Sequence, residues 1–152
     1  MPIRRHLLRW LQSRTVDIRH ADYVIERAGE PQVFRWWVIP RNRWFNLYLH
    51  CFVASDEAEA LHDHPWVNLS WLLFGGYREH FIRAGGVHQT LDRREGQWVL
   101  RWPSTAHRVE LVSGYAISLF STGPILRGWG FYCPSGWKPW KDFVEVREGG
   151  NQ

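Results

Sequence analysis

Three histidines are spaced so that their side chains can reach one point in space. His62 and His64 are two residues apart, and residues two apart on a β-strand point to the same face. His107 ends a later segment that begins at Gly96 and contains Pro103. Three neutral imidazoles that converge inside a barrel suit a divalent transition metal. The spacing therefore predicts a metal centre made by the three histidines. The alternative is a set of structural histidines in a barrel that has no metal.

Short β-strands are the elements that must position these histidines. Apolar and aromatic runs recur with Gly and Pro between them, which is typical of an all-β sandwich or barrel. We expect residues 77–83 to pair back on residues 67–74 across a tight turn of two glycines. The other expected strands cover residues 23–27, 32–39, 44–54, 98–102, 107–112, 115–122 and 129–133, and residues 140–146 form a strand or a helical turn.

The length of 152 residues suits one domain with a sizeable core. We expect a single domain over residues 1–152 whose core barrel spans residues 44–133. Apolar residues near the start fall at helical spacing, which predicts a short amphipathic helix in the N-terminal segment 1–15. These apolar residues are Ile3, Leu7, Leu8 and Leu11.

The two histidine segments resemble the two motifs of the cupin superfamily, which are small double-stranded β-helix (jelly-roll) barrels. The first motif matches at His62, His64, Asn68 and Gly75, with Asn68 where the family has a glutamate. The second motif matches at Gly96, Pro103 and His107, with one extra residue before the proline and without the second glycine. The resemblance covers the middle third of the chain and implies a cupin-type fold with a metal site.

The whole sequence also resembles a group of small, uncharacterised bacterial and phage proteins of cupin type. The shared phrases are His-Asp-His-Pro-Trp, Gly-Gly-Tyr-x-Glu, His-Arg-Val and Thr-Gly-Pro followed by Trp-Gly-Phe. This resemblance implies a fold and a metal site and does not name a reaction.

The usual cupin register implies that Tyr77 and Glu79 point into the barrel. Glu79 then has three possible roles: a fourth metal ligand, an acceptor that orients a ligand histidine, or a general acid/base. Tyr77 is a second candidate for handling a proton. The alternative is an outward glutamate, or an internal partner for an arginine. Asp63 lies between the two histidines and should point away from the metal.

Strand parity also predicts the lining of the pocket. If His62 and His64 face inward, Trp66 and Asn68 share their face, whereas the opposite row is strongly apolar and needs a cover. That opposite row (Val67, Leu69, Trp71 and Leu73) is a candidate homodimer contact. Trp102 is a further candidate wall of the pocket. Arg35, Arg101 and Arg127 are candidate anchors for a carboxylate or phosphate, and Arg127 is the best of the three.

The set of three histidine donors limits the choice of metal ion and of reaction class. Three histidines with open positions suit Fe(II) first, with Mn, Ni, Co or Zn as alternatives. The leading hypothesis is an Fe(II)-type oxygenase that acts on a small organic substrate. The alternatives are a metal-dependent isomerase, epimerase or lyase with Glu79 as base, and a non-catalytic cupin that binds a small molecule.

The composition limits the classes of partner and the cellular compartment that we expect. The net charge is +4, but the arginines are scattered and no nucleic-acid module is recognisable, so nucleic-acid binding is not expected. No apolar run is long enough to span a bilayer and no secretory signal is visible, so no membrane partner is expected. Two cysteines fit a reducing compartment, which predicts a cytoplasmic protein.

Overall fold

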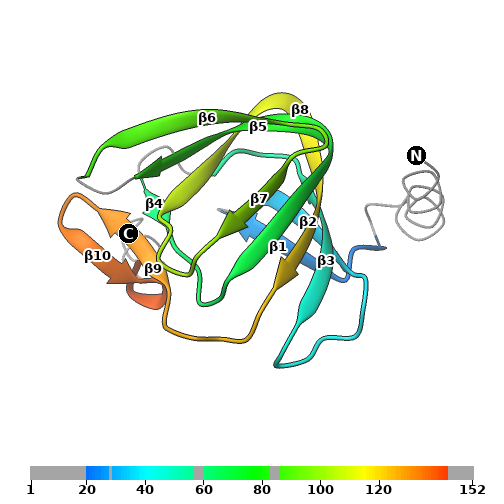
Figure 1. The fold of residues 1–152 in the computed structure, drawn as a ribbon, viewed down its shortest axis with the longest axis horizontal. Helices are drawn as coiled ribbons and strands as arrows, with labels where there is room; N and C mark the ends of the chain where they lie inside the picture. Colours follow the sequence, from blue (N-terminus) through cyan, green and yellow to red (C-terminus); the bar gives the residue numbers. More distant parts are fainter. Residues whose placement is uncertain (1–19, 28, 57–59, 83–85, 144–152) are drawn as a thin grey trace.

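The computed structural model describes residues 20–27, 29–56, 60–82 and 86–143, which form a strongly curled β-sheet (Figure 1). Ten strands occur in these ranges: β1 (Tyr23–Arg27), β2 (Glu30–Trp37), β3 (Asn46–Phe52), β4 (Leu61–His62), β5 (Asn68–Ile82), β6 (His88–Arg94), β7 (Trp98–Arg101), β8 (His107–Thr122), β9 (Gly130–Cys133) and β10 (Gly136–Pro139). A short helical turn covers residues 140–143. The helix expected in segment 1–15 lies outside the described residues. No helix in the described ranges is long and apolar enough to cross a membrane.

Two long strands, β5 and β8, pair with each other along most of their length and bend together. Their register shifts on both sides of Gly75, which has a φ of 71°. A Cβ atom at this position would collide with the backbone carbonyl oxygen of Tyr115, so the bend requires glycine there. The expectation that residues 77–83 pair back on 67–74 is therefore wrong. The glycines bend one continuous strand, and both of its halves pair with β8.

The bend divides the sheet into two halves that face each other. One half contains β1, β2, β3, the C-terminal part of β8, the N-terminal part of β5, and β7. The other half contains β6, the remaining parts of β5 and β8, and β4, β9 and β10. Rings from the two halves meet inside, where Phe52 and Tyr77 have centroids 6.1 Å apart. The predicted all-β barrel is confirmed. None of the expected strand ranges includes β4, β6 or β10, and the two strands expected over residues 107–112 and 115–122 form one continuous strand, β8.

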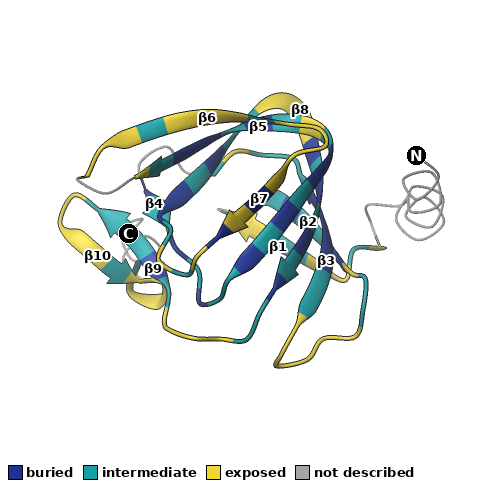
Figure 2. Ribbon diagram, viewed as in Figure 1, coloured by how far each residue is buried: buried dark blue, intermediate teal, exposed yellow. Residues whose placement is uncertain are grey.

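Burial alternates along the strands, as it must when one face lines an interior. In β8 the buried residues are every second one on each side of the bend: His107 and Val109, then Ala116, Ser118, Phe120 and Thr122. Figure 2 shows this alternation of buried and half-buried residues in β5 and β8, and a largely exposed β6. The interior is unusually polar, because Asn68, Glu79 and Arg101 are each at most 4% exposed.

A cluster of apolar side chains lies on the outer face of the sheet half that contains β1, β2 and β3. Trp36, Leu49, Cys51 and Leu73 are buried there, and Leu73 is one member of the apolar row expected to need a cover. Trp71 of the same row is half-buried and stacks on the exposed Trp98, with ring centroids 4.8 Å apart. Leu100, next to this pair on β7, is also exposed.

Candidate metal centre

His62, His64 and His107 lie together between the two halves of the sheet. One nitrogen from each ring can be chosen so that all three lie within 4.8 Å of one another. His62 is paired in register with His107 across β4 and β8, and His64 follows directly after β4. The Nε2 atoms of His64 and His107 are 2.8 Å apart. The structure thus brings together the three histidines that the spacing singles out.

Asp63 holds the two-histidine segment in place from behind. It is fully buried, and its carboxylate accepts hydrogen bonds from the backbone N–H of Gly130 at 2.8 Å and from Nη1 of Arg127 at 2.7 Å. The indole N–H of Trp137 donates to the same carboxylate at 3.1 Å. Since neighbouring residues on a strand point to opposite faces, Asp63 turns away from the histidines. It therefore ties β4 to β9 and β10, a role that its position between two histidines did not reveal.

Glu79 lies behind His107. Its Oε1 atom is 3.2 Å from Nδ1 of His107, the nitrogen on the opposite side of the ring from the His64 contact. Arg101 Nε donates to Oε1 at 2.6 Å, and Arg93 Nε donates to Oε2 at 2.7 Å. A carboxylate next to Nδ1 favours the tautomer with the proton on Nδ1, which leaves the Nε2 lone pair facing the centre.

Burial and neighbouring charges set the protonation states of His107, His64 and Glu79. Burial and the neighbouring Arg101 lower the pKa of His107 to about 4. Burial, with the His107 and His62 rings, holds the pKa of His64 well below its usual value. Burial would raise the pKa of Glu79, but His107 and Arg101 outweigh it and hold the pKa well below its ordinary range. At neutral pH the imidazoles of His64 and His107 are thus neutral, beside the ionised carboxylate of Glu79.

Two of the expected pocket residues lie inside the barrel with unused polar atoms. Asn68 is 1% exposed, and neither atom of its side-chain amide has a hydrogen-bond partner in the described structure. Trp66 lies with its ring 18° from parallel to that of His64, at 6.4 Å between centroids, and its buried indole N–H has no partner there either. Buried polar groups are rarely left unpaired, so these atoms suit a bound group or water at the centre.

The other expected site residues lie elsewhere. Trp102 is 64% exposed. Arg127 is tied to Asp63 and has its guanidinium carbon 5.8 Å from the centre of the Trp137 ring. The Tyr77 hydroxyl accepts a hydrogen bond from Arg101 at 3.2 Å, so it contacts the arginine that holds Glu79.

Arg93 is a site residue that sequence reasoning missed. It lies on β6, opposite Tyr77, and its contact with Glu79 depends on a strand that the apolar pattern does not reveal. The burial pattern of β6 shows why, because only two of its seven residues are even partly buried. A solvent-facing strand of this kind lacks the hydrophobic alternation by which strands are recognised.

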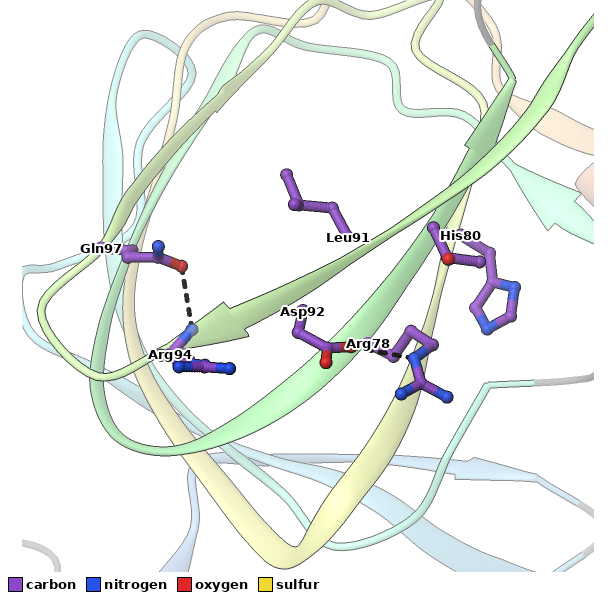
Figure 3. A pocket seen from close by; sticks show the side chains of 7 residues that line it. Arg78, His80, Leu91, Asp92, Arg94 and Gln97 are labelled. Carbon is purple, nitrogen blue, oxygen red and sulfur yellow. Dashed lines mark hydrogen bonds and ion pairs between the residues drawn. The ribbon is translucent and has the colours of Figure 1, made fainter.

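A separate depression of about 610 Å³ lies over β5 and β6. Arg78, His80 and Asp92 are among its lining residues, and Figure 3 shows Arg78 and Asp92 pointing toward each other, joined by a 2.8 Å ion pair. None of its lining residues belongs to the histidine centre.

The chemistry of the donor set fits a divalent transition metal. Three neutral imidazoles suit such an ion, and a second polar group behind a ligand histidine is a recurring feature of metal sites. His62, His64 and His107 supply the donors, and the Glu79 carboxylate supplies the group behind His107. The unpaired polar atoms of Asn68 and Trp66 leave hydrogen-bonding capacity for a further ligand.

No family model matches this sequence, and no curated protein matches it. Solved structures do share its fold. The chain is similar to the oxalate decarboxylase of Lactobacillus farciminis in its formate complex, with a TM-score of 0.55 and 11% identity over 82% of this chain and 35% of that one. It is similar to Fe(II) HppE, with a TM-score of 0.54 and 10% identity over 66% of this chain and 54% of that one. It is also similar to a cupin superfamily protein from Desulfitobacterium hafniense, with a TM-score of 0.50 and 17% identity over 66% and 84% of the two chains.

These likenesses establish that the chain has the double-stranded β-helix fold of cupins. The chain spans about half the length of HppE and about a third of the oxalate decarboxylase.

Proposed function

We propose that this protein is a metal-binding cupin in which His62, His64 and His107 hold one divalent transition metal ion. The observation that carries the proposal is the convergence of three ring nitrogens within 4.8 Å of one another inside the barrel. Fe(II) is the first candidate, with Mn, Ni, Co and Zn as alternatives, because a set of three neutral imidazoles suits each of these ions. The HppE neighbour is itself an Fe(II) protein, which agrees with the first choice.

In this proposal Glu79 positions His107 and does not bind the metal. Two arginines already donate to its two oxygens, and the histidine nitrogen nearest to it is Nδ1, behind the ligand atom. A carboxylate in such a place fixes the tautomer and the orientation of a ligand histidine. Tyr77 contributes by contacting Arg101, which keeps that guanidinium beside Glu79.

The reaction class that we propose is the oxidation of a small organic substrate by O2. A redox-active ion such as Fe(II) with open coordination positions supplies the O2 chemistry when it is bound. The residues of the chain then bind and orient the substrate, for which Trp66 and Asn68 offer a ring face and unpaired polar atoms. The shielded interior excludes bulk water from the reacting groups.

A non-catalytic small-molecule-binding cupin is the second candidate, and the state of Glu79 favours it over an isomerase or a lyase. Those enzymes need a free base, whereas Glu79 is ion-paired to two arginines and its pKa is held low by His107 and Arg101 against the effect of burial. A carboxylate in that state is a poor proton acceptor.

Oxygen consumption separates these functions. The protein is loaded with Fe(II) under anaerobic conditions, mixed with a panel of small organic acids, alcohols and thiols, and exposed to O2 at an electrode. An oxygenase consumes O2 only with its substrate, and the His64→Ala variant should not. A compound that binds by calorimetry and causes no O2 uptake would contradict the oxygenase and support the binding protein.

A further inference from the structure

Arg35 brings a positive charge to the inner face of the barrel. It lies on β2 opposite His50 of β3, and its Nε donates a hydrogen bond to Nε2 of His50 at 2.8 Å. Its guanidinium carbon is 4.8 Å from the centre of the buried Tyr48 ring. Arg35 is half-buried, and this burial lowers the pKa of its guanidinium.

No carboxylate in the described ranges lies within ion-pair distance of Arg35. The contacts of the guanidinium are an imidazole and aromatic rings, which do not neutralise it. Glu79, a buried acid of β5, is held by Arg93 and Arg101. Arg35 is thus a half-buried cation with no anion beside it in the described structure, and taking a cation out of water without an anion is costly.

A hydrogen bond and two ring contacts connect Arg35 to the histidine centre. His50 stacks on Phe120 with ring centroids 4.7 Å apart, and Phe120 lies 6.5 Å from the His64 ring. The unpaired amide of Asn68 is on the same inner face, where Asn68 is paired in register with Thr122, two residues beyond Phe120.

We propose that the site takes an anionic ligand, a carboxylate or a similar oxyanion, and that Arg35 is the charge partner of that anion inside the barrel. This inference rests on the proposed metal site and adds the substrate class to it. A divalent metal held by three neutral histidines adds two further positive charges with no acidic ligand. An anion that lies between the metal and Arg35 would compensate both, and the planar fork of an arginine matches a carboxylate.

Calorimetric titration tests the inference without any assay of activity. The probes are propanoate, oxalate and methylphosphonate, with propanamide as the neutral counterpart of propanoate, added to Co(II)-loaded protein. We expect at least one anion to bind the wild type, and propanamide not to bind. Arg35→Gln keeps a donor for His50 and removes the charge, so it should weaken anion binding about tenfold or more. Arg94→Gln, an exposed arginine of β6, should bind like the wild type.

Three results would overturn the inference: equal binding by Arg35→Gln and wild type, equal binding of propanamide and propanoate, or no binding of any of the three anions. Arg35→Lys guards against a folding artefact, since it keeps the charge and should bind the anion better than Arg35→Gln. Cobalt content, measured on the same samples, separates the two claims. A wild type that holds no cobalt contradicts the metal site, whereas normal cobalt with anion binding independent of Arg35 contradicts only this inference.

Discussion

Glu79 is a buried carboxylate that lies behind His107 of the proposed metal centre and is held by two arginines. It accepts hydrogen bonds from Arg93 and Arg101 and lies 3.2 Å from Nδ1 of His107. The three positive or polar neighbours keep it ionised, and the ionised form in turn orients His107. The loss of this one charge should therefore affect both the stability of the fold and the affinity for metal.

Glu79→Gln should lower the free energy of unfolding by about 3–5 kcal/mol, because it leaves Arg101 buried without an anion. The same variant should bind metal roughly 10–100-fold more weakly, since the tautomer of His107 is no longer enforced. Urea unfolding and a competitive metal titration measure the two effects. Glu110→Gln is the matched control, because Glu110 is a partly exposed carboxylate on β8, paired with His80. Equal stability of the two variants would contradict the role of Glu79.

The buried histidines predict how the stability of the metal-free protein depends on pH. Burial and Arg101 depress the pKa of His107 in the folded protein to about 4, against about 6.5 in the unfolded chain. The unfolded chain therefore binds more protons between these values, so the stabilisation is complete above pH 6.5 and is lost as the pH falls toward 4. The loss is on the order of 3 kcal/mol for this residue. Urea midpoints at pH 7.0, 5.5 and 4.5 measure it, and a wild type with the same pH dependence as His107→Gln would refute the account.

At the scale of elements, hydrogen bonds to Asp63 hold the segment that carries His62 and His64 in position. β4 has only two residues, too few to be stable as an isolated pairing, and yet it carries His62 and directs His64. Asp63 supplies the missing anchorage because it accepts hydrogen bonds from Gly130 of β9 and from Trp137 of β10. The backbone N–H of His64 also donates to the carbonyl of Pro103 at 3.1 Å, which attaches the segment on its other side.

Asp63→Asn should destabilise the fold by about 2–3 kcal/mol, because charge-assisted hydrogen bonds to a fully buried carboxylate are lost. Metal affinity should fall as well, since both flanking residues, His62 and His64, are proposed ligands. Thermal unfolding and metal titration check the two effects. Asp92→Asn removes an exposed ion pair with Arg78 and should leave the stability almost unchanged. Metal binding by the Asp63 variant as tight as that of the wild type would contradict the claim that the hydrogen bonds of Asp63 position His62 and His64.

At the scale of the whole molecule, the outer face of the first sheet half exposes a cluster of large apolar side chains. Trp98 and Leu100 of β7 are 58% and 60% exposed and lie beside the half-buried Trp71. Within the described structure β7 pairs only with β5, so its other edge is free for hydrogen bonding. Apolar clusters next to a free strand edge favour association, and we propose that two copies of the chain pair through this face.

Leu100→Arg should convert the proposed homodimer to a monomer, because it places a charge at the centre of an apolar interface. Light scattering after size-exclusion chromatography measures the mass of each form. Val87→Arg, at an exposed apolar residue outside this face, should leave the mass unchanged. A wild type that is monomeric at high protein concentration would contradict the proposed pairing.

The three histidines of the proposed metal centre are easier to predict from the sequence than the residues around them, because they depend on local spacing. His62, His64 and His107 could be assigned from strand parity and motif spacing, which are local properties. The bend at Gly75 could not, because two adjacent glycines permit either a reversal or a bend, and only the long-range pairing with β8 decides between them. The partners of Glu79 and Asp63 come from strands far away in the sequence, one of which has no hydrophobic alternation.

The metal content of protein purified without added metal tests the central claim most directly. Elemental analysis should find about one equivalent of a transition metal per chain in the wild type, with iron as the first expectation. The His64→Ala and His107→Ala variants should contain almost none, whereas His88→Ala, on the exposed strand β6, should match the wild type. Stoichiometric metal retained by the His64 and His107 variants, or a wild type that takes up no transition metal even on reconstitution, would contradict the account.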